Sequence, residues 1–159
     1  MPTAVSDNVA DGLAAFFAAG EFSQEIEPIA SYLDYALERT GDELLHVDVV
    51  ATITKQKVEL STNGSYSYTV PIDVVIRKHL GEDKQVDGTG RVARAAVKEM
   101  MFLTQQLFEY AMPERLPDFD EAVWQATEIL VAPNTKHLRD WKQFSAIVRI
   151  TYEVEKDFE

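Results

Sequence analysis

Three histidines have the widest chemical range of any side chains in this sequence, because imidazole binds metals and transfers protons near neutral pH. His46, His79 and His137 lie far apart in the chain, and no two have the short spacing of a metal-binding motif. His46 and Asp48 share one face of a predicted strand, where they could bind a metal or act as a base and its orienting carboxylate. A solvated polar strand face explains this pair more simply, so we expect no metal site.

Acidic pairs at strand spacing occur as Glu25 with Glu27 and as Glu153 with Glu155. Each pair would place two carboxylates on one strand face, which is an arrangement used for general acid–base catalysis. The chain contains 27 acidic residues, so pairs at this spacing arise without any catalytic role. The sequence has no recognisable nucleophile motif and no zinc-protease helix. We therefore expect no catalytic residue and no enzyme activity.

Gly88-Thr89-Gly90 precedes a predicted helix, and such glycines can let backbone amides face a phosphate. The segment lacks the lysine and hydroxyl residue of a Walker motif and the full dinucleotide fingerprint. A flexible connection over 81–90 explains the same residues, so we expect no nucleotide and no other cofactor.

The chain has 159 residues, no cysteine and a formal net charge of −12. This length suits a single domain over residues 1–159, and the missing cysteines exclude disulfides and thiol chemistry. The acidic balance argues against binding nucleic acid, which needs clustered lysine and arginine. It fits solubility alone, a surface that lets DNA pass, or a surface that meets a basic partner. We expect neither a targeting peptide at the start nor a membrane span.

The clearest structural pattern is the alternation over Ser65–His79, which predicts a half-buried β-strand with one wet face and one covered face. The apolar positions are Tyr66, Tyr68, Val70, Ile72, Val74 and Ile76, and the polar positions are Ser65, Ser67, Thr69, Asp73, Arg77 and His79. We expect Tyr66 and Tyr68 to lie at the margin of the covered region. Pro71 predicts a bulge or an edge location.

Other stretches also favour strands. Segments 45–53 and 144–154 alternate clearly, whereas 122–132 has uncertain parity and is compatible with burial on both sides. The segment 22–32 is predicted as an edge strand, because Pro28 cannot donate to a sheet ladder. A helical turn that begins at Ser31 and ends at Gly41 is an alternative to the end of this strand or follows it.

A hairpin is predicted before residue 65, because Asn63-Gly64 tolerates the positive φ angles of a tight turn. Residues 55–60 either prolong the preceding strand or form a short partner in this hairpin. Residues 115–121 read as an acidic loop.

Helical spacing appears in three segments. Ser6 is the predicted N-cap of a first helix that Gly20 closes. The main helix is predicted over 91–111, and Phe102 points away from its apolar stripe. Asn134 or Thr135 is the predicted cap of a short helix through Trp141, and an ordered loop is the alternative for this stretch. The stripe of the main helix consists of Val92, Ala96, Met100, Leu103, Leu107 and Ala111.

This order predicts an α+β fold: a mostly antiparallel sheet with an N-terminal helix and one long helix packed on one face. The order resembles that of the prophage-encoded tail terminator and tail-completion (neck) proteins of long-tailed phages. In that group, an N-terminal helix and a strand like 22–32 precede a hairpin like 45–79. A long helix like 91–111 follows, and the final strand resembles 143–152.

The resemblance implies a structural virion protein in the tail or neck, present in the host cytoplasm during assembly. Such a subunit forms a ring, typically a hexamer, that caps the tail tube at the end nearest the head. Its implied partners are further copies, the tail tube and neck proteins, with no sequence-specific nucleic acid binding and no membrane. The expected contact residues, from Phe102 and the loops 55–65 and 81–90, are Phe102, Asn63, Gly64, Gly88 and Gly90.

Two other classes stay open. An acidic binding module, such as an immunity-like protein or inhibitor that masks a basic partner, is compatible with the charge. An enzyme with a carboxylate site in the helix-covered sheet has the least support.

Overall fold

The computed structural model describes residues 3–32, 45–51, 56–60, 64–81 and 86–157. The elements in order are α1 (Val5–Ala18), β1 (Pro28–Ser31), β2 (His46–Ala51), β3 (Lys57–Leu60), β4 (Ser65–His79), α2 (Arg94–Tyr110), β5 (Arg115–Leu116), β6 (Phe119–Val131), α3 (Thr135–Trp141) and β7 (Gln143–Asp157). The described strands form one sheet in the order β1-β2-β4-β7-β6-β5, and β3 also pairs with β4. Only β1 and β2 pair in parallel among these strands. The predicted α+β class is confirmed.

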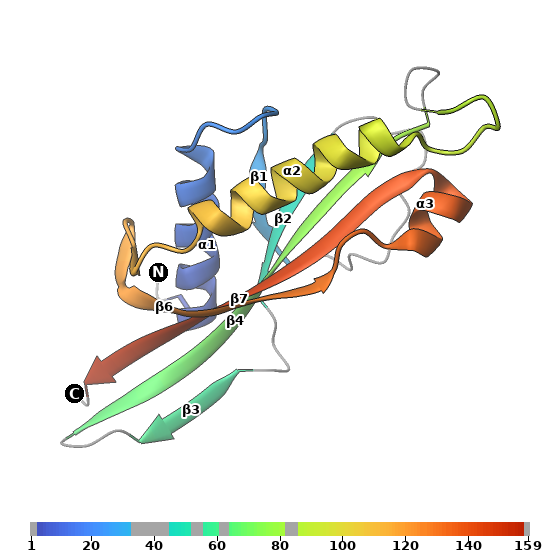
Figure 1. The fold of residues 1–159 in the computed structure, drawn as a ribbon. Coiled ribbons are helices and arrows are strands. Elements are labelled where there is room, and N and C mark those ends of the chain that lie inside the picture. Colours follow the sequence, from blue (N-terminus) through green and yellow to red (C-terminus); the bar gives the residue numbers. More distant parts are fainter. Residues whose placement is uncertain (1–2, 33–44, 52–55, 61–63, 82–85, 158–159) are drawn as a thin grey trace.

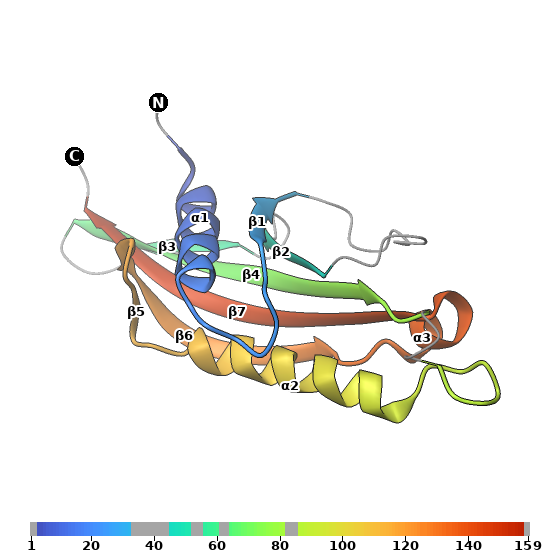
Figure 2. The same cartoon turned by 90° about the horizontal axis from the view of Figure 1, so that it is seen from above.

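The antiparallel strands β4 and β7 run along the long axis of the molecule (Figure 1). Their pairing stays in register from Ser65 opposite Asp157 to His79 opposite Gln143. The apolar face of this pair, which we call the helix face, packs against the core helices (Figure 2). Val70, Ile72, Val74 and Ile76 are all buried on this face, as the alternation predicted. Tyr66 and Tyr68 are only half-buried, because they lie toward the end of the strand.

The helices cover this face through apolar stripes at helical spacing. The most deeply buried side chains are Val9, Leu13 and Phe17 of α1 and Met100, Leu103 and Leu107 of α2. Tyr110 joins the two helices, since its ring stacks on Phe16 at 4.3 Å and meets Phe22 edge-on at 5.2 Å. Burying each such large side chain contributes about 1.5–3 kcal/mol.

Both long helices begin differently from the prediction. Ala4 is the N-cap of α1 and makes no side-chain cap, whereas Ser6 is buried inside the first turn. The prediction of Ser6 as the cap is wrong, because the helix starts earlier and includes Val5, which is buried in the core. The second long helix starts at Arg94 after Ala93, three residues later than predicted, and also lacks a side-chain cap.

The predicted edge strand over 22–32 is shorter in the structure. Only Pro28–Ser31 is a strand, and Pro28 is its first residue, where a missing donor is tolerated. Tyr32, directly after the strand, is 63% exposed, and its hydroxyl donates to the Asp7 carboxylate. The alternative helical turn that ends at Gly41 lies outside the described residues.

The hairpin before β4 is confirmed: β3 is a short antiparallel partner, and Gly64 has a φ of 86°. Asn63 lies outside the described residues. The register at Pro71 runs through without a bulge, so that alternative is wrong. On the other side of β4, the described residues of β3 pair up to Thr69 and those of β2 pair from Ile72, so Pro71 lies between these two pairings.

The uncertain parity over 122–132 has a structural cause. Register shifts place an extra residue in β6 at Gln125 and at Leu130, and each extra residue reverses the alternation. The strand is largely exposed, so the alternative of burial on both sides is wrong. The predicted acidic loop 115–121 is also wrong, because Arg115–Leu116 pairs with the start of β6.

Candidate functional site

The second face of the central strands, predicted to be wet, is buried in its middle. Asp73 is 1% exposed and Arg77 is 0% exposed. Arg77 Nη2 donates to Asp48 Oδ2 at 2.5 Å, and Arg149 donates from Nε and Nη2 to the two oxygens of Asp73 at 2.8 and 3.2 Å. Burial of these charges is possible because each has an opposite charge on a neighbouring strand. We call this side of the sheet the polar face.

The helix α3 is attached to the polar face through His137. Its Nδ1 lies 2.7 Å from Ser145 Oγ, and Gln143 Nε2 donates to the same hydroxyl at 2.9 Å. Burial lowers the pKa of His137 below its ordinary value, and the charges of Lys136 and Arg77 lower it further. Lowering the pKa favours the neutral ring, whose tautomer sets whether Nδ1 accepts from the Ser145 hydroxyl or donates to it. The Asn134 side chain caps the helix by accepting from the His137 amide, which decides between the two predicted caps.

A histidine beside a serine can activate the serine hydroxyl as a nucleophile, provided that a substrate can reach that hydroxyl. Ser145 is 4% exposed and lies inside the pairing of β4 with β7, which denies a substrate access to its hydroxyl. His137 stacks on Trp141 with ring centroids 4.2 Å apart, which leaves the ring packed rather than facing a cleft. The contact is therefore structural: it joins α3 to the sheet.

The other candidate ligands do not converge. The expectation that Asp48 is solvated is wrong, because Asp48 is 3% exposed beside Arg77. His46 is half-buried at the start of the same strand. His79 Nδ1 is buried without a hydrogen-bond partner among the described residues, and the ring packs over Gly81. Within the described ranges, no group of three His, Asp or Glu side chains is placed to bind a metal.

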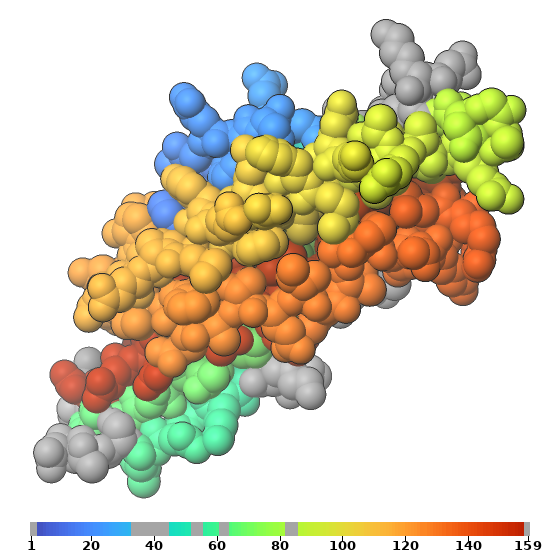
Figure 3. Space-filling model, in the orientation of Figure 1, coloured from blue at the N-terminus to red at the C-terminus, as the bar shows by residue number. Residues whose placement is uncertain are grey.

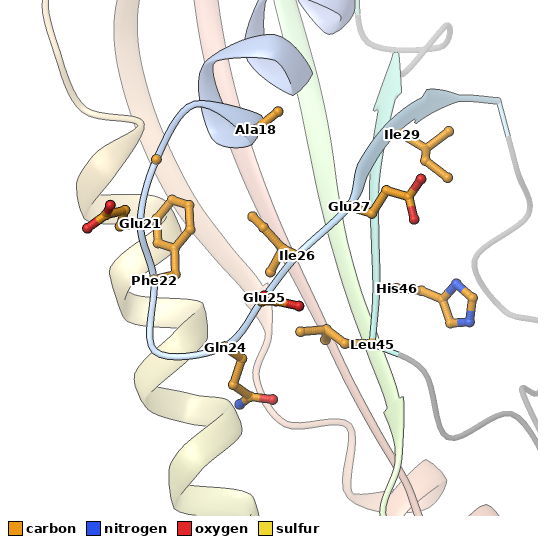
Figure 4. Close-up of a pocket in the computed structure, with 11 residues that line it drawn as sticks. Ala18, Glu21, Phe22, Gln24, Glu25, Ile26, Glu27, Ile29, Leu45 and His46 are labelled. Atoms are coloured by element: carbon orange, nitrogen blue, oxygen red, sulfur yellow. The ribbon is translucent and has the colours of Figure 1, made fainter.

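One hollow lies between the end of α1, the segment 20–29 and the start of β2, with a volume of about 900 Å³. Glu25 and Glu27, predicted as an acidic pair, both line it, and Glu27 and His46 extend to the same side (Figure 4). These glutamates are exposed to solvent. The hollow therefore presents hydrated carboxylates, and nothing in its described lining separates a catalytic acid from a surface acid.

The predicted contact residues lie apart from one another. Gly64 is at the tip of the β3–β4 hairpin, and Gly88 and Gly90 are exposed in the turn before α2, at the opposite end of the long axis (Figure 1). Phe102 is 51% exposed on α2, as predicted, and lines a hollow with Ser23 and neighbouring residues. The fold thus places Gly64 at one end of the molecule, Gly88 and Gly90 at the other end, and Phe102 between them.

The turn 86–92 is ordered, so the prediction of a flexible connection is wrong there. The Asp87 carboxylate accepts hydrogen bonds from the amides of Thr89 and Arg91 at 2.8 and 3.2 Å and from the Thr89 hydroxyl at 2.5 Å. Gly90 takes a φ of 79°, which closes the turn. The amides that would bind a phosphate are thereby already bonded to a carboxylate. This supports the prediction that no nucleotide binds here.

These hydrogen bonds also predict a pH dependence of the turn, through the ionisation of the Asp87 carboxyl. The Thr89 hydroxyl, followed by the Thr89 and Arg91 amides, lowers the pKa of Asp87 below its ordinary value. The ionised form is favoured in the fold, so the turn's contribution to stability is present above the unfolded pKa and is lost as pH falls through the folded pKa. We expect NMR titration of the Asp87 carboxyl to show this low midpoint. Thr89→Val should raise it, and an unchanged midpoint would contradict the assigned contact.

Sequence reasoning missed a basic hollow between the 86–92 turn and α3. Its volume is about 440 Å³, and its lining residues are Gly90, Arg91, Val92, Thr135, Leu138, Arg139 and Lys142. Basic residues three apart, at 136, 139 and 142, were a usable signal on a short helix. The contribution of Arg91 was not visible, because the chain that separates it from α3 includes all of α2 and β6.

Comparisons with known proteins add no assignment: no protein-family model matches the sequence, and no curated protein matches it significantly. Among the described residues, no helix combines the length and apolar character needed to cross a bilayer.

Proposed function

We propose that this chain is a structural virion protein of a phage or prophage, a tail terminator or tail-completion subunit that forms a ring at the head-proximal end of the tail tube. The observation that carries the proposal is the placement of the β3–β4 hairpin and the 86–92 turn at opposite ends of an elongated subunit (Figures 1 and 2). Two different patches on neighbouring copies make head-to-tail contacts, which produce closed rings or filaments.

Exposed strands support assembly. All four residues of β3 are exposed, with Leu60 at 80%, and β3 pairs with β4 alone among the described strands. From Ala126 onward β6 pairs only with β7 within the described residues, and Ile129 is 50% exposed. An unpaired strand edge is a template for pairing with another chain. Assembly into a ring would cover both edges.

The charge supports the same proposal. A net charge of −12 repels DNA phosphates, so a ring of such subunits would let the genome pass without trapping it. The element order on which the resemblance rests is also the order of the structure, from the first helix through the hairpin and long helix to the last strand.

Purified phage particles provide the test. We expect mass spectrometry to find the chain in the tail or neck, electron microscopy to show rings, and the rings to have no measurable affinity for duplex DNA at low salt, where electrostatic binding is strongest. Absence from the tail and neck, or tight DNA binding, would show that the proposal is wrong. A monomer that instead binds a basic protein would favour the acidic binding module.

A further inference from the structure

The two ends of the long axis carry opposite charge in the described residues. The basic end, formed by the 86–92 turn, the start of α2 and α3, carries Arg91, Arg94, Lys98, Lys136, Arg139 and Lys142 against Asp87, Glu99 and Asp140. The acidic end, formed by β3, the β5–β6 hairpin and the end of β7, carries Glu59, Asp118, Asp120, Glu121, Glu153, Glu155 and Asp157 against Lys57, Arg115 and Lys156. Figure 3 shows the 86–92 turn against α3 at one end and the hairpin with the C-terminal strand at the other. A basic end is unexpected in a chain with a net charge of −12.

The basic end contains the hollow described above, and no carboxylate is among the described residues that line it. Arg91, Arg139 and Lys142 are exposed around it. Two acidic residues neighbour these in sequence and are engaged: Asp87 holds the turn, and Asp140 lies 3.1 Å from Arg139 Nε. Lys142 ends α3 in the left-handed conformation with a φ of 47°. The turn and the end of this helix thus present three cations to one concave surface.

The acidic end presents its carboxylates in a fixed direction. Glu153 Oε1 accepts from Ser67 Oγ at 2.8 Å, and Glu155 Oε1 accepts from Ser65 Oγ at 2.7 Å. With Glu121, these glutamates line one shallow hollow on the polar face that Arg115 also lines, and we call the three carboxylates the acidic strip. Because serine hydroxyls already orient two of its side chains, a contact at the strip costs less side-chain entropy than it would with free glutamates.

We propose that the basic hollow of one copy binds the acidic strip of the next copy. This rests on the proposed ring assembly and names the contact that holds it. The two surfaces differ and lie at opposite ends, so their contact is head-to-tail and repeats from copy to copy. Opposite charges steer this encounter, whereas two basic ends or two acidic ends repel each other. The hollow's alternative occupants, inorganic phosphate and duplex DNA, are outcomes of the test.

Charge reversal in the full chain tests the contact by sedimentation velocity at low and high salt. Arg91→Glu with Arg139→Glu, and separately Glu153→Lys with Glu155→Lys, should each weaken self-association by about tenfold or more. An equimolar mixture of the two variants should restore association, because reversed ends then meet with opposite charge. A chain that carries all four substitutions should also associate. Added salt should weaken the wild-type contact.

The matched control for Glu153→Lys with Glu155→Lys is Glu25→Lys with Glu109→Lys, which raises the net charge by the same amount on exposed residues outside both surfaces and should leave association intact. A wild-type chain that stays monomeric in all conditions overturns the docking proposal. Reversal variants that associate like the wild type also overturn the docking proposal. If such variants still form rings, the proposed function is unaffected. If the chain associates in a charge-dependent way but is absent from the tail and neck, the docking proposal stands and the proposed function is wrong. Phosphate or DNA binding that Arg91→Glu with Arg139→Glu abolishes, without any change in association, also overturns the docking proposal.

Discussion

Asp48→Ala is expected to lower the free energy of unfolding by about 3–5 kcal/mol, because it removes the carboxylate beside a fully buried guanidinium. The side chains of Arg77 and Asp48 are 0% and 4% exposed, so water cannot replace the lost partner. Urea unfolding followed by circular dichroism measures the change as a shift of the midpoint at constant slope. Since a domain of this kind has only about 5–15 kcal/mol of total stability, the loss is a large share of it.

A neighbouring strand offers the matched control. Lys57 and Glu59 form an ion pair on β3 whose side chains are 65% and 61% exposed. Glu59→Ala removes the same kind of partner in water and should change the midpoint little. Replacing both buried partners, with Asp48→Leu and Arg77→Met, should recover much of the loss, because neither position then carries an unpaired buried charge. Equal midpoints for Asp48→Ala and Glu59→Ala would contradict the assigned burial.

Val74→Asp is expected to prevent stable folding, with a loss of more than about 4 kcal/mol. Val74 is 1% exposed in the centre of β4, and its partners on the two sides, Val49 and Val148, are buried apolar residues of the same face. A carboxylate there has neither water nor an opposite charge among these neighbours. The melting temperature and the soluble yield of the variant are the measurements.

Val58→Asp makes the same chemical change on a strand that also pairs with β4, where the side chain is 55% exposed. We expect this variant to fold with a much smaller loss, so the difference between the two isolates burial from β-propensity. Val74→Thr adds a polar group without a charge and should fall between them. A Val74→Asp protein that melts like Val58→Asp would contradict the burial assigned to Val74.

Strand existence was largely predictable, because alternation is a local property of the chain. Residues 65–79 form β4 with the helix-facing parity expected, and Phe144 begins the alternation of β7. The extra residues of β6 were not predictable, since a bulge depends on the partner strand as well as on its own sequence. The same limit applies to β1, whose parallel pairing with β2 depends on a neighbour distant in the chain.

Apart from Phe102 on the main helix, the contact residues were predicted only as loop positions. Glycine type and turn chemistry indicated Gly64 and Gly90, and both have positive φ in the structure. Residue type and turn chemistry do not indicate how far apart the two turns lie. Only the long β4–β7 pair places them at opposite ends of the molecule. The basic hollow was missed for the same reason, because its residues come from two separate segments of the chain.

By itself, the sequence determined the fold class, the buried helix face and the acidic balance, because side-chain parity, helical spacing and charge are carried by neighbouring residues. Only the tertiary structure decided that the polar face is buried. Asp48 and Arg77 are 29 residues apart, and Asp73 and Arg149 are 76 apart. The sequence of one strand predicts that a charged side chain is solvated. Its burial becomes possible only when another strand supplies an opposite charge, and that pairing depends on register across the sheet.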